Sequence, residues 1–169
     1  MTLWSILASG AGVVAIAAAG SLLLPRHVHV EREATLQAAP EAVLALAASN
    51  TGYQQFNPYL SADPALKIDP FGPPSGVGSG FAFDGKDGTG TQVVAQVSDA
   101  AVHYDIDLGA MGEPTQTIAV DPVADGVRVT WSMDADMGFN PVGRVMGLFL
   151  DGMIGKTLDR GLGNLAAAI

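Results

Sequence analysis

The sequence predicts an α+β fold in which an antiparallel sheet packs one face against a long C-terminal helix. Apolar residues recur every three or four positions from residue 140 to residue 169, which is the period of one helix face. Apolar and polar residues alternate along residues 102–108 and 127–135, as they do in strands with one buried and one solvated face. A helix over residues 140–169 would be about 43 Å long, so it needs a large apolar partner such as this sheet.

The N-terminal segment is predicted to anchor the chain in a membrane. Residues 3–24 contain no charged side chain, and at about 1.5 Å per residue they cover roughly 33 Å, enough to cross a hydrocarbon core. A cleaved signal peptide is the alternative, because a run of three alanines ending at Ala19 is typical of a cleavage site. The anchor is favoured because no Lys or Arg precedes the apolar run. We therefore expect residues 1–25 to form a single-pass membrane anchor and residues 26–169 to form one domain.

The charge of the chain argues against some classes of partner. The sequence has 8 Lys and Arg residues against 17 Asp and Glu residues, and its net charge is −9. Such an acidic chain argues against nucleic acid and against an anionic membrane surface as partners. Arg26 and Arg32 after the apolar run favour a cytoplasmic domain, but two residues leave the side of the membrane undecided. The chain has no cysteine, which rules out disulfides and thiolate chemistry.

The domain is predicted to begin with one strand and two short helices. Apolar and polar residues alternate along residues 28–36, which predicts the strand. Pro40 suits the start of a helix, so residues 41–48 are predicted to be helical. Residues 49–59 carry aromatic side chains at three-residue spacing, which favours a second short helix.

Six further strands are predicted before the last helix, because short apolar stretches there are separated by turn residues at hairpin-like intervals. The Asp125-Gly126 pair is a favoured hairpin turn. The predicted strands are residues 65–68, 79–83, 91–97, 102–108, 116–120 and 127–135. Together with residues 28–36 they give a seven-stranded antiparallel sheet.

The last helix carries two sets of apolar residues. Asn140 is suited to cap its N-terminus, and Pro141 is suited to its first position. At about 100° per residue, the apolar residues of its first and second halves point in directions roughly 120° apart. One straight helix could not present both sets to the same sheet, so we expect a bend near Gly152 and Gly155.

Five short stretches of the chain resemble a known family. They are LPRHVHVER at residues 24–32, GPPSGVG at 72–78, VTWSM at 129–133, GFNP at 138–141, and the helix from MGL at 146–148 to MIG at 153–155. In this order they resemble the START-like (SRPBCC) superfamily, in particular the bacterial polyketide cyclase/dehydrase and lipid-transport group. The resemblance implies the helix-grip fold, in which a curved seven-stranded sheet wraps the last helix and two short helices follow the first strand. Members of that group often carry tryptophans where this chain has other aromatic residues, so the identity of the ligand is not carried over.

Two patterns in the sequence resemble functional motifs, but each is better explained as an ordinary part of the sheet than as a binding site. Residues 76–80 are rich in glycine, but they run from strand to strand, whereas a dinucleotide-binding loop leads from a strand into a helix. His103, Asp105 and Asp107 share one strand face, but neighbours on such a face are about 7 Å apart and cannot all close on one ion. They also oppose the apolar face of their strand. We therefore expect no metal site and no cofactor.

The candidate site is an apolar cavity between the sheet and the last helix, because helix-grip sheets commonly hold the helix away from the sheet. Tyr104 and Trp131 would supply its polar groups. The predicted ligand-binding residues are Tyr53, Phe56, Tyr59, Phe81, Phe83, Tyr104, Ile106, Ile118, Trp131, Met133, Met146, Phe149 and Met153. The alternative is an ordinary packed core of the same residues, which periodicity alone favours.

Three functions follow from these expectations. The first is a membrane-tethered binder or carrier of an apolar small molecule, such as a lipid or a polyketide-like compound. The second is a cyclase or dehydratase acting on a polyketide-like substrate, and the third is an interaction module whose cavity is filled. An enzyme needs an acid or a base that faces the pocket, and the predicted inward residues include Tyr104 but no His, Asp, Glu or Lys. The binder is therefore favoured, with no catalytic residue assigned, and the question of catalysis stays open.

Overall fold

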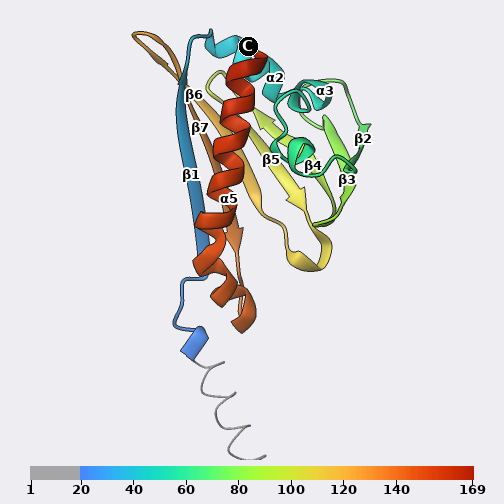
Figure 1. Ribbon diagram of the computed structural model, residues 1–169, viewed down its shortest axis with the longest axis vertical. Coiled ribbons are helices and arrows are strands. Elements are labelled where there is room, and N and C mark those ends of the chain that lie inside the picture. Colours follow the sequence, from blue (N-terminus) through green and yellow to red (C-terminus); the bar gives the residue numbers. More distant parts are fainter. Residues whose placement is uncertain (1–19) are drawn as a thin grey trace, which may run out of the picture.

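The computed structural model describes residues 20–169 (Figure 1). The predicted membrane anchor at residues 1–25 lies almost entirely outside the described residues, so it stays a prediction. Within residues 20–169, no helix is both long enough and apolar enough to cross a membrane.

Seven antiparallel strands form one sheet, as predicted. In chain order they are β1 (His27–Leu36), β2 (Lys67–Phe71), β3 (Gly80–Gly85), β4 (Gly88–Val97), β5 (Ala101–Asp107), β6 (Thr115–Val123) and β7 (Gly126–Asp136). Their order across the sheet is β1-β7-β6-β5-β4-β3-β2. Strands β2 to β7 therefore pair with their neighbours in sequence, while the pairing of β1 with β7 joins two distant parts of the chain.

Helices cover one face of this sheet. Three short ones follow β1, namely α2 (Pro40–Ala47), α3 (Asn50–Tyr53) and α4 (Pro58–Ala62), and α5 (Pro141–Ala168) ends the chain. A 3₁₀ turn, η1 (Gly109–Met111), joins β5 to β6. Helix α5 runs along β1 and β7, and the short helices lie beside it (Figure 1). Contacts of α2 with β5 and β6, and of α4 with α5, close the layer over the sheet.

The single helix expected over residues 49–59 is divided into α3 and α4. The side chain of Asn57 accepts a hydrogen bond from the Tyr59 backbone N–H at 3.0 Å, and Pro58 is the first residue of α4. Helix α3 ends at Tyr53, and a turn over residues 54–56 leads to Asn57. A residue before proline is disfavoured in the helical conformation, so Asn57 is not helical and α4 begins only at Pro58. The division buries Tyr53 and Phe56 completely but leaves Tyr59 38% exposed.

The start of α5 confirms the predicted cap. The Asn140 side chain accepts hydrogen bonds from the backbone N–H groups of Val142 at 3.0 Å and Gly143 at 3.2 Å. Pro141 takes the first helical position, where its missing N–H leaves no hydrogen bond unmade. The end of β7 and the beginning of α5 are thereby held in a short, defined connection.

The two halves of α5 differ in what they bury. In the second half, Leu158, Leu162 and Leu165 are at most 3% exposed. In the first half Leu150 and Ile154 pack partly buried against the core. The other large apolar side chains there stay exposed, namely Val142 (70%), Val145 (43%), Met146 (48%), Leu148 (56%), Phe149 (60%) and Met153 (58%). The helix continues without interruption through Gly152 and Gly155. One of its two apolar sets is thus left largely unburied, and the bend expected near Gly152 and Gly155 stays a prediction.

Candidate functional site

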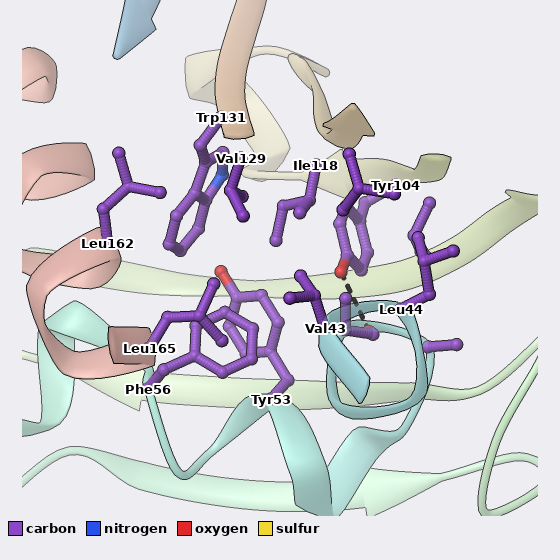
Figure 2. Packing of buried hydrophobic residues seen from close by; sticks show 14 of the residues in the cluster. Val43, Leu44, Tyr53, Phe56, Tyr104, Ile118, Val129, Trp131, Leu162 and Leu165 are labelled. Carbon is purple, nitrogen blue, oxygen red and sulfur yellow. Dashed lines mark hydrogen bonds between the residues drawn. The ribbon is translucent and has the colours of Figure 1, made fainter. Parts of the chain in front are cut away.

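A cluster of aromatic side chains fills the space between the sheet and the helices (Figure 2). The Tyr53 ring lies at its centre, with its centroid 4.8 Å from that of Phe56 and 5.4 Å from that of Phe81. The same centroid is 5.7 Å from that of Tyr104 and 6.0 Å from that of Trp131, both edge-on. Tilted and edge-on pairs at these distances are the favourable geometries for aromatic rings. All five side chains are at most 5% exposed.

The strand register explains why side chains from different strands meet here. Ile118 lies directly opposite Trp131, and Gln116 lies opposite both Met133 and Tyr104. Residues that are directly opposite in antiparallel strands point to the same face of the sheet. The buried face of β5, β6 and β7 is therefore one continuous wall, and Figure 2 shows Trp131, Ile118 and Tyr104 along it.

Two glutamines on this buried face are not among the predicted site residues. Gln116 is 4% exposed, and its Oε1 accepts a hydrogen bond from Trp131 Nε1 at 3.1 Å. Gln92 is 5% exposed, and its amide lies near the Tyr53 hydroxyl, but its Nε2 has no partner at hydrogen-bond distance and angle among residues 20–169. Each glutamine lies two positions from a buried apolar residue of its own strand, Val94 for Gln92 and Ile118 for Gln116. This period of two is the signal that could have found them.

The two buried tyrosines are neutral donors. The Tyr104 hydroxyl donates a hydrogen bond to the Ala47 carbonyl oxygen at 2.8 Å. Burial raises the pKa of the Tyr104 phenol well above its ordinary value, and burial likewise raises the pKa of the Tyr53 phenol. Both groups therefore keep their protons at neutral pH and can polarise an acceptor, but they cannot serve as bases.

Little space remains inside the cluster. A cavity of about 10 Å³ lies among Tyr53, Phe81, Gln92 and Tyr104. This volume is close to the smallest that can hold one water molecule. A larger apolar molecule enters this region only when the surrounding side chains move apart.

The predicted site residues fall into two groups. The structure buries Tyr53, Phe56, Phe81, Tyr104, Ile106, Ile118, Trp131 and Met133. Phe83 packs partly buried against the same core, and Tyr59 lies at its margin. Met146, Phe149 and Met153 do not join the cluster, because they are 48% to 60% exposed on the first half of α5.

The exposed residues of α5 form a stripe on the side where α4 lies. We call Val142, Met146, Phe149 and Met153 the α5 stripe. At about 100° per residue, this stripe shares its direction with Arg160, whose guanidinium donates to the Pro58 carbonyl oxygen of α4 at 3.5 Å. Helix α4 therefore contacts α5 near Arg160, whereas the stripe lies nearer the start of α5 and stays exposed.

The strand register places Gln92 level with the part of β1 that the first half of α5 contacts. A methyl group on Gly147 would lie 2.9 Å from Val28 Cγ2, so α5 approaches β1 closely at this point. Val28 lies opposite Ala135 of β7. The register of β6 and β7 makes Ala135 level with Pro114, whose carbonyl oxygen accepts a hydrogen bond from the Ile106 N–H of β5 at 3.1 Å. Ile106 in turn lies opposite Gln92. Gln92 is thus level with Val28 across the sheet, and strands β5, β6 and β7 lie between the two residues.

The interior offers no acid or base among the described residues. Their buried polar side chains are Ser21, Asn50, Asn57, Ser79, Gln92, Gln116, Ser132 and Arg144. Arg144, the charged member of this set, lies at the start of α5 and not in the aromatic cluster. His103 lies on β5 between inward-facing residues, and its Nδ1 is 2.9 Å from Thr117 Oγ1. The arrangement can therefore bind and orient an apolar molecule through phenol and amide groups.

Comparisons with known proteins agree with this architecture. The sequence profile of a family described as polyketide cyclase / dehydrase and lipid transport matches residues 27–169. No curated protein matches the chain. Three solved structures share the fold at low sequence identity, and at such identities the likeness concerns the fold alone.

The first of these structures is the di-domain ARO/CYC StfQ from the steffimycin biosynthetic pathway, with a TM-score of 0.61 and 12% identity over 83% of this chain and 50% of that chain. Protein CV1439 from Chromobacterium violaceum has a TM-score of 0.60 and 14% identity over 83% of this chain and 96% of that chain. Ara h 8.0201 has a TM-score of 0.59 and 13% identity over 83% of this chain and 99% of that chain. The chain thus spans half the length of the di-domain protein and nearly the whole of the other two.

Proposed function

Since the chain belongs to the polyketide cyclase / dehydrase and lipid transport family, we propose that it binds or carries an apolar small molecule between its sheet and α5. The ligand class is a lipid or a polyketide-like compound. In this proposal residues 26–169 form the binding domain, and residues 1–25 tether it to a membrane as a single-pass anchor. The family description and the biosynthetic setting named for StfQ support the ligand class.

One observation carries the proposal: a donor without a partner, Gln92 Nε2, lies inside the aromatic cluster, beside a small cavity lined by Tyr53, Phe81 and Tyr104. The exposed α5 stripe adds apolar surface on the helix that covers the sheet. Buried donors without a partner are rare and costly in folded proteins. Apolar walls with a few well-placed polar groups are the usual composition of a small-molecule site. A ligand carbonyl or hydroxyl oxygen would accept from Gln92 while its apolar part contacts the stripe.

The route of entry lies between the α5 stripe and α4. The second half of α5 is fixed by the buried residues Leu158, Leu162 and Leu165. The first half buries far less apolar surface, and elements with few buried apolar contacts open most readily. In this proposal, movement of this half away from β1 opens space over the cross-strand row that leads from Val28 to Gln92. The ligand site is therefore a space that opens at one end of the fold.

The polar side chains of the interior make catalysis the weaker alternative. General acid–base catalysis works best with a group whose pKa lies near the working pH. Burial moves the phenol pKa values of Tyr53 and Tyr104 upward, away from that range. Gln92 and Gln116 do not titrate. What the interior can supply to a polyketide-like substrate is shape and hydrogen-bonded orientation.

The test begins with the full chain purified in a maltoside detergent. Mass spectrometry of the organic extract is expected to show co-purifying lipid-like or polyketide-like material. Titration with a fluorescent fatty acid then compares the wild type with the double variant Phe149→Ser, Met153→Ser. Removing two large apolar contacts is expected to weaken binding about tenfold or more.

The control is Val97→Ser, which changes an apolar residue that is 39% exposed at the far end of β4. It is expected to bind the fatty acid as the wild type does. Equal affinity of the wild type and the stripe double variant, with no co-purifying material, would overturn the proposed function.

A further inference from the structure

Arg144 is a buried cation without an acidic partner among the described residues. Arg144 is 7% exposed, and it takes part in none of the ion pairs within residues 20–169. Its Nε donates to the Gly138 carbonyl at 2.9 Å, and its Nη1 donates to the carbonyls of Leu24, at 3.1 Å, and Leu22. Its Nη2 makes no hydrogen bond within the described part of the chain. Buried arginines are normally paired with an anion, so this one points to an anionic ligand.

Arg144 lines a surface cavity of about 200 Å³ between the beginning of β1 and the first half of α5. Its other walls are Pro25, His27, Val28, His29, Gly147 and Leu148. The volume is several times the roughly 30 Å³ that a water molecule occupies in the liquid, so a phosphate group and part of its ester fit there. At about 100° per residue, Arg144 points away from the α5 stripe, to the opposite side of the helix. This cavity is therefore separate from the proposed site for the apolar ligand.

The neighbouring charges are already paired. Arg26 donates two hydrogen bonds to Asp136, at 2.7 Å and 2.6 Å. His29 Nδ1 lies 2.7 Å from Asp134 Oδ1 on the adjacent strand. These carboxylates are held by partners of their own, and neither is within ion-pair distance of Arg144. Arg144 thus supplies the uncompensated positive charge at the cavity.

Exposed apolar residues surround this end of the molecule. Leu23 is 89% exposed, Phe139 77% and Leu148 56%. The Phe139 ring joins this apolar rim to the cations, because its centroid is 5.8 Å from Cζ of Arg144 and 5.5 Å from Cζ of Arg26. Apolar residues that flank a cation are typical of protein surfaces that meet the headgroup region of a membrane. The uncharged run of residues 3–24 also joins the domain at this end.

We propose that the cavity beside Arg144 binds the phosphate group of a phospholipid, with the acyl chains on the apolar rim. Arginine suits this role because its planar guanidinium matches two phosphate oxygens at once. The net charge of −9 argues against general attraction to an anionic surface, but one buried cation in a cavity recognises one phosphate group. The inference does not depend on the apolar ligand of the other side of α5, and each can fail without the other.

The test is isothermal titration calorimetry of the full chain in a maltoside detergent. The probes are dihexanoyl phosphatidic acid, which carries phosphate and short acyl chains, and inorganic phosphate, which carries none. We expect phosphatidic acid to bind more tightly than inorganic phosphate. Arg144→Gln is expected to lose about tenfold or more in that affinity, the effect of removing a hydrogen bond between charged groups. Arg128→Gln is the matched control, since Arg128 is exposed on β7 and far from the cavity in sequence and register.

A second variant separates binding from folding, because Arg144→Gln also loses the bonds to three backbone carbonyls. Leu148→Gln keeps those bonds and changes only the rim. It is expected to weaken phosphatidic acid binding several-fold and to leave inorganic phosphate binding unchanged. Equal affinity for the two probes, or unchanged phosphatidic acid binding in Leu148→Gln and in a folded Arg144→Gln, would overturn the proposal.

Discussion

The indole ring of Trp131 lies directly against the backbone of Gly161, so that no larger residue fits at position 161. A Cβ atom there would overlap ring carbon Cζ3 and lie 2.9 Å from Cη2. Trp131 is 1% exposed, and its Nε1 is held by Gln116, so the ring has little freedom to move. Glycine inside a helix ordinarily costs about 1 kcal/mol relative to alanine. Here it allows the second half of α5 to reach the sheet.

We expect Gly161→Ala to destabilise the fold by about 1–3 kcal/mol, the usual effect of inserting a methyl group into a packed core. Gly163→Ala is the control on the same helix, because a Cβ there would meet nothing within 4 Å. It is expected to stabilise by about 0.5–1 kcal/mol through helix propensity alone. Urea unfolding followed by circular dichroism measures both. Equal stability of the two variants would show that Trp131 does not hold α5 at Gly161.

Local patterns were sufficient to predict most of the sheet and the last helix. The alternation in β5 and β7 can be recognised within a few residues, and so can the Asn140-Pro141 cap. The structure confirms the strands and the helix that these local patterns predict. The division between α3 and α4 carried the same kind of signal in Asn57-Pro58, but the aromatic spacing across it favoured one helix. There the rule for residues before proline outweighs side-chain periodicity.

Periodicity alone could not predict which of the two apolar faces of α5 is buried. The choice depends on contacts with β1, a strand more than a hundred residues earlier. Arg32 of β1 donates to Asp151 Oδ1 at 3.0 Å, and its guanidinium occupies the space where a Cβ on Gly155 would lie. Gly147 likewise lies against Val28. These contacts turn the first half of α5 toward β1 and leave its apolar stripe exposed.

The aromatic part of the candidate site was predictable, whereas its polar groups were not. Tyr104 and Trp131 lie on strands with clear alternation, so their direction followed from the pattern. Gln92 and Gln116 occupy inward positions of β4 and β6. A polar residue at an inward position looks like a break in the pattern until the register places it opposite a buried neighbour, as Gln116 is opposite Met133.

The two buried glutamines should respond in opposite ways to replacement by leucine. Gln116→Leu leaves Trp131 Nε1 buried without an acceptor, which is expected to cost about 1–3 kcal/mol. Gln92→Leu removes a buried donor that has no partner, so stability is expected to stay the same or rise. Chemical unfolding of both variants in parallel measures the contrast. A loss in Gln92→Leu as large as that in Gln116→Leu would mean that the Gln92 amide is satisfied in solution.

The Arg26–Asp136 pair predicts a pH dependence of stability. The hydrogen bonds from Arg26 hold the pKa of the Asp136 carboxyl well below its usual range. A lowered pKa in the folded state stabilises the fold above the unfolded value of about 4, and this contribution is lost as the pH falls through the folded value. Arg26→Gln is therefore expected to lower the melting temperature at pH 7.

The difference between Arg26→Gln and the wild type should shrink as the pH is lowered below about 4, because the Asp136 carboxyl is then protonated first in the unfolded chain and, near its lowered pKa, also in the folded wild type. Melting curves of both proteins between pH 7 and pH 2 provide the measurement. A difference that is constant over this range would mean that Arg26 acts through its contact with Phe139 and not through the carboxylate.

Tyr104 separates the binder from the enzyme. Its hydroxyl donates to the Ala47 carbonyl oxygen at the end of α2, and burial raises its pKa, so its hydrogen bond is already committed to the fold. Tyr104→Phe is expected to cost about 1 kcal/mol of stability, the ordinary value of one hydrogen bond. The affinity for a fluorescent fatty acid should stay within about twofold, since the ring remains in place. Turnover of a polyketide-like substrate that disappears in Tyr104→Phe while fatty acid binding persists would establish the phenol as a catalytic group, because loss of packing alone would weaken both together.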